Sequence, residues 1–318
     1  MGNKSSHIQN ILSEVSKDSL KAYLFGIEGL RHAWENYDAL RERAEFIGAT
    51  LRSFHLSVEN QEVPFYGRTY QNIIATMEDG DKEKDWILIG AHYDAAWGSP
   101  GADDNASGVA VLLEAARILS SQKLNSTVQF VAFTLEEPQL QTIKFLIGSE
   151  YFAKEARRLK RNYGAVLILE SVGYTSEKEG SQIVPFLVRR SVPGKGNFLG
   201  VIANRRSKAL MEEFYSVAGE YVPELSVIPY KVPLSGFIIP ETRFSDHASF
   251  WNYRYPALML TDTAMFRNPH YHTYHDSLAT LDFEFIANVT KAVVSSVLIF
   301  SSGGHSRSGD SPSPSSTS

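Results

Sequence analysis

The sequence contains no cysteine, and this absence removes several kinds of chemistry together. Disulfide frameworks, iron–sulfur clusters, thiolate zinc sites and cysteine nucleophiles all depend on the sulfur of that residue. Any metal in this protein must therefore be held by histidine and carboxylate side chains. The 318 residues include 9 histidines and 36 aspartates and glutamates, so ligands of these two kinds are available.

Excess positive charge and long apolar runs are also lacking. The 31 lysines and arginines are outnumbered by the acidic residues, and the formal net charge is −5. Because nucleic-acid binders usually carry a basic patch, nucleic acid is not an expected partner. No apolar run resembling a signal peptide follows Met1, and no stretch approaches the roughly 18 to 20 apolar residues of a membrane span. We expect a cytoplasmic protein without a membrane partner.

Short apolar runs of strand length alternate with helical patterns along the chain. The predicted strands cover residues 73–77, 86–91, 128–135, 165–169, 199–203 and 257–260. The predicted helices cover residues 34–54, 109–119, 150–159 and 208–221. Runs that are apolar on both faces suit a sheet that helices cover on both sides. The sequence therefore predicts an α/β fold, a three-layer α/β/α sandwich around a mixed, mostly parallel sheet.

One large domain is expected, with an extension at each end. Residues 1–33 form the N-terminal extension, of which 1–20 are polar and weakly patterned. Residues 34–300 contain no internal repeat and no linker rich in proline, glycine and serine, so they are predicted to form the single domain. Residues 301–318 have little to bury and are predicted to be a disordered tail rich in those three residues.

Side chains that can bind metal or move protons follow several of these strands. They are His92 with Asp94, the run Asp103, Asp104 and Asn105, the pair Glu136 and Glu137, and Glu170. In a sheet covered by helices, ligands collect at the carboxyl ends of the strands, so we expect these residues to lie close together. Asp94 lies two residues after His92, on the same face, where a carboxylate can accept a hydrogen bond from the distal N–H of the imidazole.

Two further observations favour a metal centre. The adjacent carboxylates of Glu136 and Glu137 repel one another unless a cation neutralises them. The segment 268–276 brings three histidines, at 270, 272 and 275, into six residues of predicted loop. A set of two imidazoles and three carboxylates suits two hydrolytic ions that share a bridging carboxylate, with Zn²⁺, Co²⁺ or Mn²⁺ admissible. That set is His92, Asp104, Glu137, Glu170 and His272.

Five motifs in order along the chain carry a family resemblance. They are His92-Tyr-Asp94, the run Pro100–Gly108, Glu136-Glu137, Ser245-Asp-His-Ala248, and His272-Thr273 followed by Asp276-Ser-Leu278. Over about residues 35 to 300 the chain resembles the M28 family of co-catalytic zinc peptidases. The resemblance implies a zinc-exopeptidase-like fold, two zinc ions per chain and an aminopeptidase that takes a peptide as substrate.

The resemblance also implies a role for each residue of the motifs. Asp104 would bridge the two metals, whereas spacing alone does not separate it from Asp103. Glu137 and His272 would complete one metal site, and His92 and Glu170 would complete the other. Glu136 would be the general base, and Asp94 would orient His92.

Other readings stay open at this stage. A single-zinc acyltransferase similar to glutaminyl cyclases would use fewer of these ligands, and a receptor-like member of the fold would use none. Serine hydrolysis is excluded, because no G-x-S-x-G motif occurs and Ser245, Asp246 and His247 are consecutive. Four aromatic residues near the motifs could line an apolar pocket or simply pack in the core: Tyr93, Trp97, Phe250 and Tyr271.

Overall fold

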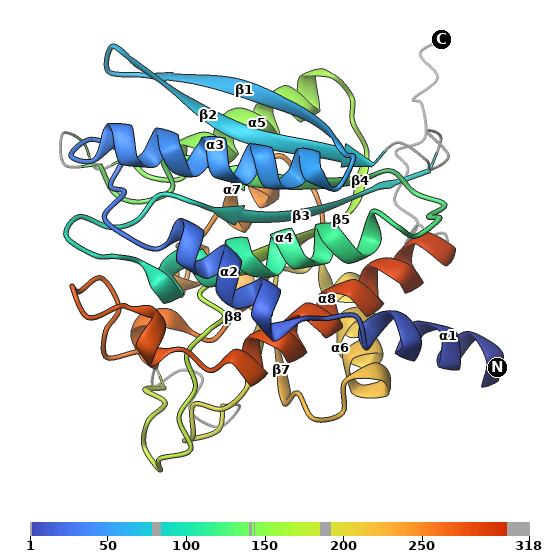
Figure 1. Cartoon of the computed structure of the whole chain (residues 1–318). Coiled ribbons are helices and arrows are strands. Elements are labelled where there is room, and N and C mark those ends of the chain that lie inside the picture. The colour runs from blue at the N-terminus through green and yellow to red at the C-terminus, as the bar shows by residue number, and fades with distance from the viewer. Residues whose placement is uncertain (1, 78–83, 140–141, 143, 185–191, 304–318) are drawn as a thin grey trace, which may run out of the picture.

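A mixed sheet of eight strands forms the centre of the protein (Figure 1). The structure, a computed structural model, describes residues 2–77, 84–139, 142, 144–184 and 192–303. The strands are β1 Ser57–Phe65, β2 Arg68–Met77, β3 Trp86–His92, β4 Val128–Phe133, β5 Tyr163–Glu170, β6 Leu199–Ala203, β7 Val227–Lys231 and β8 Ala257–Thr261. Their order across the sheet is β1-β2-β4-β3-β5-β8-β6-β7.

Parallel pairing brings the ends of the central strands together. Strands β4, β3, β5 and β8 are mutually parallel neighbours, and β6 pairs with β7 in the same way. The pairs β1–β2, β2–β4 and β6–β8 are antiparallel, so the sheet is mixed and mostly parallel, as predicted. Because parallel strands end at the same edge, the residues that follow β3, β4, β5 and β8 meet there.

Helices cover both faces of the sheet and complete the predicted three layers. They are α1 Gly2–Leu12, α2 Lys17–Ile27, α3 Tyr37–Ser53, α4 Gly108–Leu119, α5 Ile147–Arg158, α6 Lys208–Tyr221, α7 His247–Asn252 and α8 Phe283–Ser302. In Figure 1, α2, α3, α4 and α8 lie in front of the sheet, and α5 and α7 lie behind it. The buried apolar residues accordingly form two clusters, one on each face.

The N-terminal segment, for which the sequence predicts no element, folds into two helices that join the larger core. Ile8 and Leu12 of α1 are buried, and Leu20, Leu24 and Ile27 of α2 are fully buried in the same cluster as α4 and α8. Apolar residues spaced three and four apart give each helix one buried stripe among polar neighbours. The turn after α2 then reaches the edge where the central strands end, since the backbone N–H of residue 29 donates to Pro100 O at 3.0 Å.

Helix α8 corrects one expectation from the sequence. The helix is long and apolar enough to cross a membrane by length and composition, with a mean hydropathy of 1.6 in its most apolar 18-residue window. The expectation that no such stretch exists was therefore wrong. The helix packs inside the protein, where 72% of its most apolar window is buried, and this burial explains its composition. Ser301 and Ser302 of the predicted tail end this helix and Gly303 follows it, whereas 304–318 lie outside the described residues.

Candidate metal centre

His92 ends β3 and is almost completely buried at the edge of the sheet. Its Nε2 atom lies 3.2 Å from Asp104 Oδ1 and 3.5 Å from Glu170 Oε2. Glu170 ends β5, the strand that pairs with β3, so the parallel register brings the imidazole and this carboxylate together. The other ring nitrogen, Nδ1, lies 3.3 Å from the backbone oxygen of Asp94.

Asp104 lies in a tight turn, Ala102–Ser107, that leads into α4. Its backbone leaves the helical region (φ −105°, ψ 91°). The two oxygens of Asp276 accept hydrogen bonds from the N–H groups of Asp103 at 2.9 Å and Asp104 at 3.1 Å. Asn105 fixes the other side, because its Nδ2 donates to Leu169 O at 2.8 Å. The turn therefore has one position relative to β5 and to the segment that follows His272.

The structure separates the two adjacent aspartates. Asp103 points away from the histidines, and its carboxylate accepts hydrogen bonds from Gly173 N at 2.8 Å and Asn268 Nδ2 at 2.7 Å. Asp104 points between them, with Oδ1 toward His92 and Oδ2 at 3.0 Å from the Nε2 of His272. Only the carboxylate of Asp104 faces both imidazoles.

Two groups of three potential ligands result. His92, Asp104 and Glu170 form one, and Asp104, Glu137 and His272 form the other. In each group the ligand atoms lie within 4.8 Å of one another, and Asp104 belongs to both. The structure thus brings together all five residues that the sequence singles out, grouped as the family resemblance implies. Their roles as metal ligands stay a prediction.

Unpaired buried atoms supply a test of whether a metal fits. Among the described residues, His92 Nε2, Asp104 Oδ1 and Glu137 Oε1 are buried and have no hydrogen-bond partner. Buried polar atoms are normally satisfied, so each of these three atoms needs a further partner. The donors are imidazole nitrogen and carboxylate oxygen, the set that zinc accepts. The residues therefore fit divalent metal.

Electrostatics at the centre point the same way. Burial raises the pKa of Glu170 above its usual value and that of Glu137 to about 7. Burial also disfavours charge on the imidazole of His272, yet the carboxylates of Glu137 and Asp104 outweigh it and raise the pKa of His272 to about 11. The buried carboxylates therefore favour a cation among them, and a divalent ion suits that place.

Asp94 accepts hydrogen bonds from the backbone of Glu136 and Glu137, a role that the sequence does not reveal. Its Oδ1 accepts a hydrogen bond from the backbone N–H of Glu136 at 3.1 Å, and its Oδ2 accepts one from Glu137 N at 3.2 Å. Its carboxylate is 3.6 Å from His92 Nδ1, farther than the backbone oxygen of Asp94 itself. The carboxylate therefore fixes the backbone of both glutamates directly, while the imidazole is held mainly by a carbonyl group.

Two more residues of the centre belong to the motif Ser245-Asp-His-Ala248, to which the sequence assigns no roles. Ser245 donates its hydroxyl to Glu170 Oε2 at 2.7 Å and so limits how that side chain can rotate. Asp246 is fully buried, and neither of its carboxylate oxygens has a hydrogen-bond partner among the described residues. Burial raises the pKa of Asp246 to about 7.

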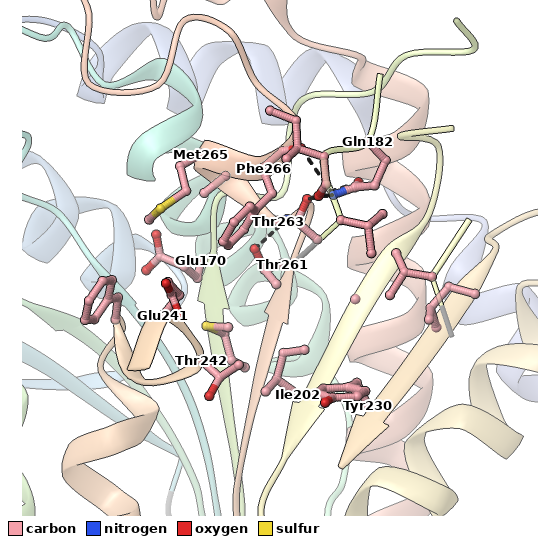
Figure 2. A pocket seen from close by; sticks show the side chains of 18 of the residues that line it. Glu170, Gln182, Ile202, Tyr230, Glu241, Thr242, Thr261, Thr263, Met265 and Phe266 are labelled. Carbon is pink, nitrogen blue, oxygen red and sulfur yellow. Dashed lines mark hydrogen bonds between the residues drawn. The ribbon is translucent and has the colours of Figure 1, made fainter. Parts of the chain in front are cut away.

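An apolar pocket opens beside the candidate metal centre (Figure 2). Glu170 and Tyr271 line it at the centre, and the sheet supplies its floor with residues that alternate along three strands and so share a face. These floor residues are Gly200 and Ile202 of β6, Ile228 and Tyr230 of β7, and Met259 and Thr261 of β8. The pocket is partly open to solvent, and its lining is mostly apolar.

The four aromatic residues near the motifs lie in different environments. Tyr271 lines the pocket and stacks on the imidazole of His272, with ring centroids 3.9 Å apart. Tyr93 and Phe250 are buried in the two core clusters, and Trp97 is 64% exposed. Packing in the core was thus the right interpretation for Tyr93 and Phe250, and lining a pocket was the right one for Tyr271.

A family assignment follows from the sequence as a whole. The profile of peptidase family M28 matches residues 72–297, which is most of the chain and includes all five candidate ligands. The chain belongs to peptidase family M28. As a member of a peptidase family it is a hydrolase. Further relatives, of Pyrenophora tritici-repentis and Leptosphaeria maculans, carry the name probable zinc metalloprotease.

Individual relatives are similar to this chain over most of its length. The uncharacterized protein YfbL of Escherichia coli is 35% identical over 269 residues, which cover 82% of this chain and 80% of that protein. A probable leucine aminopeptidase of Arthroderma otae is 26% identical over 308 residues, covering 91% of this chain and 74% of the relative.

Solved structures share the M28 fold. The LapA aminopeptidase of Legionella pneumophila matches with a TM-score of 0.74 at 19% identity, covering 94% of this chain and 75% of that one. A glutaminyl cyclase of Bacteroides thetaiotaomicron matches with a TM-score of 0.66 at 18% identity, covering 89% of this chain and 97% of that one. At these identities the likeness concerns the fold alone.

Proposed function

We propose that this M28 chain is an aminopeptidase that removes the N-terminal residue from peptides with the help of two zinc ions. The observation that carries the proposal is the sharing of Asp104 between the two groups of candidate ligands. His92 and Glu170 would hold one ion with Asp104, and Glu137 and His272 would hold the other. Bound in this way, the zinc ions would lower the pKa of a water molecule and polarise the scissile carbonyl group.

Glu136 is the proposed general base. Its Oε2 lies 3.8 Å from His92 Nε2, yet its carboxylate belongs to neither group of ligands. It is therefore free to accept a proton from the attacking water and to pass it to the leaving amine. The hydrogen bond from its backbone N–H to Asp94 fixes the point from which the side chain extends.

The apolar pocket supports a preference for substrates with an apolar first residue. A side chain seated in it would lie on the shared face of β6, β7 and β8, among Ile202, Ile228 and Met259. Glu170 and Tyr271 stand where the pocket meets the candidate metal centre, so the residue to be released and the bond to be cleaved would be adjacent. Burying an aliphatic or aromatic side chain there would contribute about 1.5 to 3 kcal/mol.

The single-zinc cyclase is the second candidate, because cyclase structures share the fold. A cyclase would transfer the acyl group of an N-terminal glutamine to its own amine and release ammonia without consuming water. The intact second group, Asp104, Glu137 and His272, favours hydrolysis, since a one-metal enzyme has less use for it.

The deciding experiment is a panel of aminoacyl anilides, short peptides and a glutaminyl peptide, assayed with and without a chelator. We expect release of apolar N-terminal residues that stops on chelation and returns with Zn²⁺. Glu136→Gln should keep its zinc and lose about 10²- to 10⁴-fold in kcat.

Glu212→Gln is the matched control, because Glu212 lies on α6, where it pairs with Lys208. Cyclisation of the glutaminyl peptide without hydrolysis of the others would replace the proposal with the cyclase. Absence of turnover on every substrate, with zinc bound, would favour a receptor-like protein.

A further inference from the structure

A buried arginine from the N-terminal segment reaches the loop that joins two of the candidate ligands. Arg31 lies in the turn between α2 and α3, and its side chain is among the largest that are fully buried. The loop in question is residues 93–103, between His92 and Asp104. Its carbonyl groups accept the hydrogen bonds of the guanidinium.

All three nitrogens of the Arg31 guanidinium donate to carbonyl oxygens. Nε donates to Tyr93 O at 2.7 Å, and Nη2 donates to Gly101 O at 2.8 Å. Nη1 donates to Pro100 O and, within its own turn, to Gly29 O at 3.1 Å. The planar fork therefore contacts both ends of the loop at once, a geometry that a lysine cannot reproduce.

The same turn also holds the segment after His272. Glu28 Oε1 accepts a hydrogen bond from the backbone N–H of Leu278 at 2.9 Å. Leu278 follows Asp276, whose carboxylate binds the N–H groups of Asp103 and Asp104. Residues 28–31 therefore stabilise the backbone on both sides of Asp104, which both groups of candidate ligands share.

Nearby carboxylates help to keep the buried guanidinium of Arg31 charged. Burial lowers the pKa of Arg31 to about 10, and the nearby carboxylates of Asp276, Asp104 and Asp94 oppose that effect. The guanidinium therefore remains charged at neutral pH. Its hydrogen bonds are charge-assisted, and such bonds are stronger than those between neutral groups.

From these contacts we infer that Arg31 is a positioning residue of the metal centre, which sets the distance between His92 and Asp104 through the loop that joins them. Metal ligands must lie within about 0.5 Å of their productive positions, and removal of a supporting group typically weakens metal binding about 10- to 100-fold. The inference rests on the proposed function only in requiring that the five candidate ligands bind metal. It makes the N-terminal segment part of the working enzyme.

The test compares Arg31→Met and Arg31→Lys with the matched variant Arg43→Met in the full chain. Arg43 holds the other side of the same turn, where it donates to Ile27 O and Glu28 O instead of to the loop. We expect Arg31→Met to bind Zn²⁺ about 10- to 100-fold more weakly in chelator competition. We also expect an altered visible spectrum of the Co²⁺ form, and a fall in kcat with little change in KM.

Several outcomes would overturn the inference. If Arg31→Met folds and retains the parental zinc affinity and cobalt spectrum, Arg31 does not position the centre. The same holds if Arg43→Met shows equal losses at an equal melting temperature. Should Arg31→Met fail to fold, Arg31→Lys decides, with an intermediate affinity expected and an unchanged one contradicting the inference. A parent that binds two metals but cleaves no peptide would refute the proposed function and leave these metal measurements valid.

Discussion

The carboxylate of Asp94 holds the backbone of Glu136 in place, with 3.1 Å between its Oδ1 and the amide nitrogen. Its second oxygen does the same for Glu137. Asp94→Asn leaves one acceptor and places an NH₂ group against the other N–H. We expect kcat to fall about 10- to 100-fold, the range for groups that support metal ligands. Asp18→Asn, an exposed change in α2, should have no effect. A rate for Asp94→Asn equal to the parental one would show that these hydrogen bonds do not matter for turnover.

Ser245 offers a way to perturb one metal site. Ser245→Ala removes the 2.7 Å hydrogen bond to Glu170 and leaves Glu170 Oε2 without that donor. We expect one of two zinc dissociation constants to rise about 10- to 100-fold while the other changes little. Isothermal titration of the metal-free protein with Zn²⁺ measures both. The control is Ser249→Ala, because Ser249 is buried nearby in α7 and its hydroxyl contacts that of Ser149. Equal weakening of both sites would contradict an effect through Glu170.

Gly200 sets the depth of the apolar pocket. A Cβ atom there would lie 3.3 Å from Thr261 O and 3.6 Å from Thr263 Cγ2. A larger side chain at this position would therefore fit after a small adjustment of the strands and would occupy part of the pocket. We expect Gly200→Val to lower kcat/KM for leucyl and phenylalanyl anilides about 10-fold or more relative to the alanyl anilide, as 1.4 kcal/mol of lost burial would. Gly219→Ala, which meets nothing within 4 Å, is the control. An unchanged order of preference would mean that the pocket does not take the first side chain.

His247 should make the fold sensitive to acid. Its Nε2–H donates to Thr242 O at 2.9 Å, its Nδ1 is buried without a hydrogen-bond partner among the described residues, and its ring lies against Trp251. Burial lowers its pKa to about 3, and nearby Arg243 adds to this. The unfolded chain, with a pKa near 6.5, then binds a proton that the folded chain does not. Stability therefore falls as pH drops from about 6.5 toward 3, by up to about 1.4 kcal/mol per pH unit.

Urea unfolding of the metal-free protein between pH 7 and 4 measures this slope. We expect His247→Gln to lose less stability over that range than the parent, even if it is less stable at pH 7. His7→Gln, at an exposed position in α1, should keep the parental slope. Equal slopes for the parent and His247→Gln would rule out His247 as the source of the acid sensitivity.

The central strands and the candidate ligands could be predicted from the sequence because both are marked by apolar runs. Buried strands are continuous apolar runs, and a polar residue at the end of such a run is conspicuous. The structure has β6 over the predicted residues Leu199–Ala203 and α6 over Lys208–Tyr221. His92 and Glu170 each end such a strand, so the shared edge of parallel strands was enough to group them.

The features that the sequence did not predict are exposed strands and hydrogen bonds between residues far apart in the chain. Strand β1 has the sequence SVENQEVPF and is largely exposed along one edge, so it presents no apolar run. At the opposite edge, β7 contains Pro229 and no fully buried residue. The hydrogen bonds from Arg31 to Tyr93 O and from Ser245 to Glu170 join residues more than 60 positions apart in the chain, and one sequence contains no signal of such pairs.

Glu170 belongs both to a candidate ligand group and to the wall of the apolar pocket. A ligand seated in that pocket would therefore touch a residue that, as a metal ligand, would also govern how tightly the ion is held. Loading the protein with cobalt or manganese in place of zinc should consequently reorder its preferences among N-terminal residues. An inhibitor designed for the pocket alone should, in turn, slow the escape of the ion.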